Sequence, residues 1–321
     1  MYASWNARAV GLGLTAGETV EVAARAGFDA VDLLVRDLVE SRVDPQSVRG
    51  RMDELGLRGG AWPLPVHWRG NPEQFAEDLR DLPRYARAAA TLGLQRTGTW
   101  VLPETDSTLF PGSEGDDLLR RTVRLHVERL GKIAEILADH GSRLGLEIMG
   151  PASARQGPGP DFVHQYHRLT DQLGELRAEH PNVGVLVDAF HLFAAGEGVE
   201  AGFVWGVDAV VWVHVADSAN PDRLRVHDQE RALPGETGLA DCLGLLKRLA
   251  EQGYDGPVTG EPLKHCRSLQ GLDALATARR TLASLQTIWP GPLVDANTCG
   301  PKDSGVTNQT VTSSSEPLPV R

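Results

Sequence analysis

The chain has 321 residues, of which 43 are acidic and 32 are basic, so its formal net charge is -11. An apolar fraction of 41% excludes an intrinsically disordered chain, and 3 cysteines cannot form a disulfide framework. The acidic balance disfavours a nucleic-acid-binding protein, although a local basic patch would remain compatible with it. Because the N-terminus has no apolar signal segment and no apolar run reaches the ~18 residues of a membrane span, we predict a cytoplasmic protein.

Short apolar runs alternate with amphipathic stretches between residues 8 and 288. Strands are predicted at Ala9–Leu14, Ala30–Leu34, Leu57–Trp62, Arg96–Val101, Arg143–Met149, Val183–Phe190, Val210–Ala216 and Gly256–Pro262. The clearest helices are predicted at Glu18–Ala26, Glu73–Leu92, Leu118–His140, Phe162–Glu179, Leu239–Gln252 and Leu269–Gln286. Thr15 with Glu18 fits a capping box, and Asn71 before Pro72 is typical of a helix start. Left-handed residues are expected after helices at Gly27, Gly56, Gly93, Gly141 and Gly253.

Eight βα units in one chain of this length predict a (β/α)8 TIM barrel that forms a single domain over residues 1–290. An open doubly wound sheet is the alternative, but residues 11–17 lack the dinucleotide-binding glycine spacing that usually follows its first strand. Residues 291–321 are rich in Ser, Thr, Pro and Gly and have no apolar period. We expect a flexible tail there, with an arm around a partner subunit as the alternative.

Four successive strands of the predicted barrel each end in a residue that can bind a metal. These residues are Glu147, Asp188, His214 and Glu261. The active sites of TIM barrels lie at the C-terminal ends of the strands, and the period-two alternation of a strand can turn all four side chains inward. Any one of them alone could be a cap or a loop residue, but the succession favours a metal site.

Three carboxylates and one imidazole form an oxygen-rich ligand set. Such a set suits Mn²⁺ best, with Mg²⁺, Co²⁺ or Zn²⁺ as alternatives. Without a cation, three crowded carboxylates would repel one another and bind protons. The sequence therefore predicts one divalent metal ion in the chain.

The segments around these residues resemble the sugar phosphate isomerase/epimerase superfamily, whose fold is the xylose-isomerase-like barrel. They are LGLE (144–147), VLVDAFH (185–191), VHVAD (213–217), RALPGETG (231–238) and GYDGPVTGEP (253–262). The superfamily includes ketose 3-epimerases, hydroxypyruvate isomerase, and inosose isomerases and dehydratases. The resemblance implies the same four metal ligands, and it implies that His191 approaches the substrate.

The resemblance also implies a mechanism, in which a proton moves on the carbon beside a carbonyl that the metal ion holds. As in related ketose epimerases, Glu147 and Glu261 would act as acid and base on opposite faces of the substrate. Two departures make the epimerase substrate pose doubtful and leave the metal ligands intact. Ser153 stands where those epimerases carry a second Glu, and Asn220 stands where they carry an Arg.

Further residues are predicted to bind the substrate at the mouth of the barrel. They are Trp62, His67, Trp68, Trp100, Arg155, Arg223 and His227, and Asp228 and Arg231, close to His227 in the sequence, could line the pocket with it. Each Trp could stack on a sugar or simply pack a loop, and Arg155 and Arg223 could equally be surface residues. Trp212 is predicted to lie in the barrel core below His214. No Gly-rich phosphate loop is present, so a phosphorylated substrate is not implied.

The leading function is a metal-dependent isomerase or epimerase of a sugar, keto-sugar or cyclitol. The nearest alternative is a lyase of the same fold, either a dehydratase or a subunit that cleaves 3-keto-glycosides or C-glycosides. Elimination needs a general acid above the leaving group, for which His191 or His227 is the candidate. An abasic-site endonuclease is disfavoured because the chain lacks further metal ligands and a basic surface, and a silent binding protein is disfavoured by the intact ligands. We expect a small carbohydrate-like partner, no nucleic acid and no membrane, with a homo-oligomer left open.

Overall fold

Parallel strands of two to six residues form the centre of the fold in the computed structural model, which describes residues 1–291. They are β1 (Tyr2–Trp5), β2 (Ala30–Val31), β3 (Arg58–Gly59), β4 (Trp62–Pro63), β5 (Arg96–Trp100), β6 (Arg143–Glu147), β7 (Val183–Asp188), β8 (Val210–Val215) and β11 (Pro257–Gly260). Their order in the sheet is β3-β2-β1-β11-β8-β7-β6-β5-β4. A two-stranded antiparallel hairpin, β9 (Asp217–Ser218) with β10 (Arg231–Ala232), lies outside this sheet.

The strands close into a ring because β3 and β4 are two halves of one extended segment. The first half pairs with β2, with Arg58 opposite Ala30, and the second half pairs with β5, with Trp62 opposite Thr97. The backbone N–H of Gly60 bonds to the carbonyl of Val31, which continues the pairing between the halves. The sheet is therefore an eight-membered barrel, and the predicted TIM barrel is confirmed.

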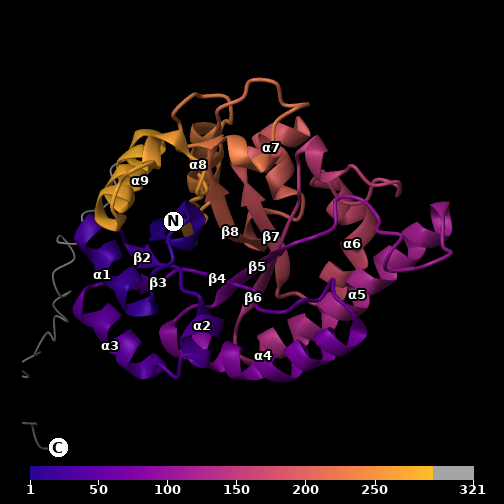
Figure 1. Ribbon diagram of the computed structural model, residues 1–321, viewed down its shortest axis with the longest axis horizontal. Coiled ribbons are helices and arrows are strands. Elements are labelled where there is room, and N and C mark those ends of the chain that lie inside the picture. The colour runs from indigo at the N-terminus through magenta and orange to yellow at the C-terminus, as the bar shows by residue number, and fades with distance from the viewer. Residues whose placement is uncertain (292–321) are drawn as a thin grey trace, which may run out of the picture.

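Helices surround the ring of strands (Figure 1). They are α1 (Ala16–Ala26), α2 (Val35–Glu40), α3 (Pro45–Glu54), α4 (Pro72–Leu92), α5 (Gly115–Asp139), α6 (His167–Glu179), α7 (Ala189–Ala195), α8 (Cys242–Glu251) and α9 (Ala274–Ile288). The capping box of Thr15 and Glu18 and the cap of Asn71 are present as predicted. All five glycines predicted after helices have positive φ angles, between 66° and 94°. Among the described residues, no helix has the length and apolar character needed to cross a bilayer.

Two apolar layers pack the barrel. The larger layer fills the space between strands and helices, and a small cluster of Ala61, Leu186 and Trp212 fills the interior. Gly98 leaves room for these side chains, because a Cβ atom there would lie 2.6 Å from Leu186 Cδ1 and 3.2 Å from the Trp212 ring. The close filling of the interior leaves the carboxyl ends of the strands as the place for polar chemistry.

The first predicted strand is wrong. Residues Arg8–Val10 form a 3-10 turn that ends at Gly11 with a φ of 81°, and the first strand is the earlier segment Tyr2–Trp5. The predicted strand Val183–Phe190 also ends early, because the Asp188 carboxylate accepts the N–H of Phe190 and starts α7. The predicted tail lies outside the described residues from position 292 onward.

Candidate metal centre

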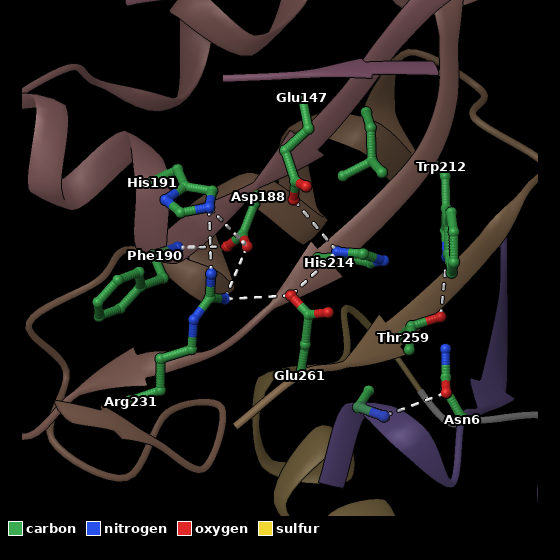
Figure 2. A network of polar contacts seen from close by, with 12 residues as sticks. Asn6, Glu147, Asp188, Phe190, His191, Trp212, His214, Arg231, Thr259 and Glu261 are labelled. Carbon is green, nitrogen blue, oxygen red and sulfur yellow. Dashed lines mark hydrogen bonds and ion pairs between the residues drawn. The ribbon is translucent and has the colours of Figure 1, made fainter. Parts of the chain in front are cut away.

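The four predicted ligands come together at the carboxyl ends of neighbouring strands (Figure 2). Glu147 ends β6, Asp188 ends β7, His214 lies near the end of β8, and Glu261 follows β11. Asp188 lies opposite His214 in the sheet, and Glu261 donates its backbone N–H to the carbonyl of Val215. Strand pairing therefore sets the level of these three residues along the barrel axis. One ligand atom from each residue lies within 4.8 Å of the others.

Three buried polar atoms of this group have no hydrogen-bond partner among residues 1–291. His214 Nδ1 lies 3.4 Å from Glu147 Oε1 and 3.2 Å from Glu261 Oε2, yet neither contact has hydrogen-bond geometry. Both His214 nitrogens and Glu147 Oε1 are buried without a partner. Because such atoms are costly to leave unpaired, the group is better explained as a ligand set than as a structural network.

The ionisable groups respond to this crowding in different directions. Burial raises the pKa of Glu147 above its ordinary value. Burial lowers the pKa of His214, but the carboxylates of Glu261 and Glu147 outweigh it and raise that pKa well above its ordinary value. The carboxylates thus draw positive charge to the centre. A divalent ion would supply that charge with Glu147, Asp188, His214 and Glu261 as its ligands.

Arg231 is the cationic side chain that reaches this centre. Its Nη1 donates to Asp188 Oδ2 at 2.7 Å and to Glu261 Oε2 at 3.3 Å. Its Nη2 contacts His191 Nε2 at 3.1 Å, where the guanidinium can only donate, and also bonds Asp228 Oδ1 at 3.1 Å. The three carboxylates of the ligand group and this guanidinium carry a net formal charge of about -2 with a neutral His214, which a divalent cation would balance.

The β9–β10 hairpin positions Arg231 beside the ligand group. Arg231 lies opposite Ser218 in the hairpin, and its guanidinium lies 4.4 Å from the centroid of the Phe190 ring. The Asp217 carboxylate anchors the loop that follows, because it accepts the backbone N–H groups of residues 237 to 240. Arg231 was expected from the sequence only among the residues that could line the pocket, without a contact to the ligand group. Asn220, the position expected to match an Arg, instead binds the carboxylate of Glu230.

A chain of buried hydrogen bonds lies beneath the ligand group, in the barrel interior. Trp212 is buried in the interior as predicted, and its ring meets the His214 ring edge-on with centroids 4.4 Å apart. Trp212 Nε1 donates to Thr259 Oγ1 at 2.9 Å, and that hydroxyl donates to Asp32 Oδ2 at 2.7 Å. Asp32 Oδ1 in turn accepts from Ser4 Oγ at 2.6 Å and from the backbone N–H of Ala61 at 2.7 Å. No sequence pattern indicated a role for Asp32.

The predicted substrate-binding residues after the third and fourth strands occupy different layers. Trp62 and Trp68 are fully buried and belong to the large apolar cluster. Trp68 packs edge-on against His126. The His67 ring is 64% exposed and contacts Asp78. Trp100 is exposed at the end of β5.

The remaining predicted site residues lie on different loops and helices. His191 lies beside the centre, with its Nε2 3.9 Å from Asp188 Oδ2. Arg155 donates to the carbonyl of Gly150 within its own loop. Arg223 is exposed and lies against Gly196, at the end of α7. His227 is exposed at the start of a short 3-10 turn.

Comparison with known proteins agrees with this geometry. The family model for the xylose isomerase-like TIM barrel matches residues 20–287, so the chain belongs to that family. Over 256 residues the chain is 27% identical to a 3-dehydroshikimate dehydratase of Pseudomonas aeruginosa, a match that covers 78% of this chain and 37% of the dehydratase. A Pseudomonas putida protein of the same name matches equally well, at 27% identity with 36% of its length covered. The chain thus spans little more than a third of the curated relatives it matches.

Solved structures share the barrel over most of their length. A xylose isomerase domain protein from Alicyclobacillus acidocaldarius is 26% identical, with a TM-score of 0.75 over 92% of this chain and 99% of that one. The IolI protein with a bound zinc atom is 16% identical, with a TM-score of 0.71 over 90% and 98% of the two chains. D-psicose 3-epimerase from Clostridium cellulolyticum H10, with D-tagatose, is 15% identical, with a TM-score of 0.66 over 90% and 98%. The last two likenesses show the fold alone.

Proposed function

We propose that this member of the xylose isomerase-like TIM barrel family is a divalent-metal-dependent enzyme that moves a proton next to a carbonyl of a sugar, keto-sugar or cyclitol. The observation that carries the proposal is the convergence of Glu147, Asp188, His214 and Glu261 at the carboxyl ends of four neighbouring strands. The zinc atom in the IolI structure supports a divalent ion in this fold. We expect Mn²⁺ to be the preferred ion.

The roles of the residues follow from their order around the barrel. When bound, the ion would polarise the substrate carbonyl and make the neighbouring C–H more acidic. Glu147 and Glu261 come from the two outer strands of the four, β6 and β11, with His214 between their carboxylates. This placement lets one carboxylate take the proton and the other return it on the opposite face. Arg231 and His191 would orient a hydroxyl or carbonyl oxygen beside Asp188.

Isomerisation or epimerisation fits the surroundings of the two histidines better than elimination does. His191 Nε2 accepts from Arg231, so that nitrogen carries no proton for a leaving group in this arrangement. His227 is exposed on the loop before β10. The proton of His191 then sits on Nδ1, which is buried without a partner within residues 1–291, and the nitrogen beside Asp188, Nε2, has no N–H to offer.

A dehydratase is the second candidate, and the two curated relatives favour it because both are named 3-dehydroshikimate dehydratase. The same removal of a proton beside a carbonyl begins such an elimination, and a metal-ligating carboxylic acid could protonate the departing hydroxyl. The two reactions differ in the product, because elimination releases water and leaves a conjugated double bond.

Incubation in heavy water tests the proposal. Mn²⁺-loaded protein is mixed with D-fructose, L-sorbose, D-tagatose, 2-keto-myo-inositol, a 3-keto-glucoside and the keto-acids 5-keto-D-gluconate and 3-dehydroshikimate, and the products are followed by mass spectrometry and NMR. We expect deuterium on the carbon beside the carbonyl of at least one compound, lost in Glu147→Gln and Glu261→Gln but kept in Glu73→Gln on the exposed start of α4. Loss of water with new ultraviolet absorbance would select the dehydratase. Absence of both exchange and water loss in the whole panel would contradict the proposal.

A further inference from the structure

Arg69 is a cation without a counter-charge at the rim of the barrel. Within residues 1–291 its guanidinium forms no ion pair, and burial alone lowers its pKa, to about 10, so that it stays protonated at neutral pH. A half-buried charge that lacks a carboxylate partner is unfavourable for the folded protein. Such an arrangement is typical of a group kept ready for a ligand of opposite charge.

Two tryptophans and a backbone carbonyl hold this guanidinium. Its central carbon lies 3.6 Å from the Trp100 ring centroid and 4.8 Å from that of Trp68. Its Nη1 donates to the Trp100 carbonyl at 2.6 Å and to Thr99 Oγ1 at 3.3 Å. Arg129 fixes the backbone on both sides, because it donates to the carbonyls of residues 68 and 70 at 2.6 Å each. The guanidinium is therefore held in place before any ligand arrives.

The position of Trp100 places Arg69 near the metal ligands. Trp100 lies directly opposite Glu147 in the sheet, and residues opposite each other in parallel strands share a face and are about 4.8 Å apart. The inward face of β5 is identified by Gly98, two residues earlier, whose Cβ would meet the interior side chains Leu186 and Trp212. Trp100 therefore faces the barrel mouth beside Glu147, and Arg69 lies on its ring.

The hydrogen bonds of Arg69 leave one edge of the guanidinium free. Both of its hydrogen bonds within the described residues use Nη1, so Nε and Nη2 have no partner there. These two nitrogens present parallel N–H groups, whose spacing matches the two oxygens of a carboxylate. A phosphate is a weaker match, because phosphate sites usually add backbone N–H groups or a second cation around the anion.

We propose that Arg69 binds a carboxylate group of the substrate, so that the enzyme acts on a keto-acid rather than on a neutral sugar. This inference rests on the proposed function for the reacting end of the molecule, at Glu147 and Glu261. Trp100 would pack against the carbon skeleton between the carboxylate and the ketone. The proposed site thus has a metal-binding end at Glu147 and Glu261 and an anion-binding end at Arg69, both at the mouth of the barrel.

A matched pair of ligands tests the inference. 5-Keto-D-gluconate and L-sorbose share the same carbon skeleton and ketone and differ in a terminal carboxylate or hydroxymethyl group. Binding to Mn²⁺-loaded and chelator-treated protein is measured by calorimetry for wild type, Arg69→Met, Arg69→Lys and the control Arg58→Met. Arg58 also lies over an aromatic ring, that of Tyr2, but on β3 and β1 at the amino ends of the strands.

We expect wild type to prefer the carboxylate ligand by about 10- to 100-fold, as bidentate charged hydrogen bonds predict. Arg69→Met should abolish the preference, Arg69→Lys should retain part of it, and Arg58→Met should keep it within twofold. Equal binding of the two ligands to wild type, or an unchanged preference in Arg69→Met, would overturn the inference. Stronger binding of L-sorbose 6-phosphate than of the carboxylate would overturn the choice of carboxylate.

The binding test is independent of turnover. A carboxylate preference that depends on Arg69, with no deuterium exchange in any substrate, would leave the anion site standing and refute the proposed reaction. Deuterium exchange without that preference would support the proposed reaction and refute the anion site at Arg69.

Discussion

Substitution of Thr259 tests how the buried chain beneath the metal centre contributes to stability. Thr259→Val keeps the shape of the side chain and removes the hydroxyl that accepts from Trp212 Nε1 and donates to Asp32 Oδ2. Thr259→Ser keeps the hydroxyl and removes only a methyl group. The residue is fully buried, so water cannot replace either lost partner without a rearrangement.

The expected sizes of the two effects differ. In Thr259→Val the indole N–H and one carboxylate oxygen lose their partners, and each unsatisfied buried group costs about 1–3 kcal/mol, so the loss should be about 2–6 kcal/mol. In Thr259→Ser the loss should be about 1 kcal/mol, the value of one buried methyl group. The valine variant should also bind Mn²⁺ more weakly, since Trp212 packs against His214.

Urea unfolding of chelator-treated protein, followed by circular dichroism, measures both free energies without a contribution from bound metal. Tryptophan fluorescence of the folded state reports on the surroundings of Trp212 alongside the other indoles. A valine variant that is as stable as wild type, or more stable than the serine variant, would refute the view that the hydrogen bonds of Thr259 to Trp212 and Asp32 stabilise the barrel beneath the ligand group.

Two further predictions concern the fold. His126 is fully buried, donates from Nδ1 to the Thr122 carbonyl and accepts the Leu102 N–H, and burial lowers its pKa to about 3. The unfolded chain takes up a proton there below pH ~6.5, so stability should fall by about 2 kcal/mol between pH 8 and pH 5, and His126→Gln should lose that part of the pH dependence in urea titrations. Gly184→Ala should unfold at clearly lower temperature, because its Cβ would lie 2.0 Å from a backbone oxygen, whereas Gly174→Ala meets no atom within 4 Å and should stabilise α6 by up to ~1 kcal/mol. Equal melting temperatures for the two glycine variants would contradict this packing.

The candidate ligand group could be predicted from sequence because each of its residues lies at the end of its own apolar strand. Glu147, Asp188, His214 and Glu261 need only the rule that strand ends meet at one rim and the period of a strand. Both are local properties of short segments. The fold class followed in the same way from the alternation of strands and helices.

The residues around the ligands depend on the path of long connections, which local patterns do not specify. Arg231 is 43 residues from Asp188 in the sequence and reaches it only through the β9–β10 hairpin. Trp62 was expected at the mouth, but the break between β3 and β4 changes the alternation. Gly60 and Ala61, although consecutive, both face the interior, where a Cβ at Gly60 would meet Asp32 and Ala61 packs on Trp212. Trp62 lies opposite Thr97, the residue before the inward-facing Gly98, so its side chain is on the outer face of the sheet, toward the helices.

Metal analysis tests the central claim most directly. Chelator-treated protein is dialysed against Mn²⁺, washed, and analysed for metal per chain, with wild type compared to the double variant Glu147→Gln with Asp188→Asn and to Glu73→Gln. We predict close to one ion per chain in wild type and in Glu73→Gln, and almost none in the double variant. No bound ion in wild type, or an undiminished ion in the double variant, would contradict the metal centre.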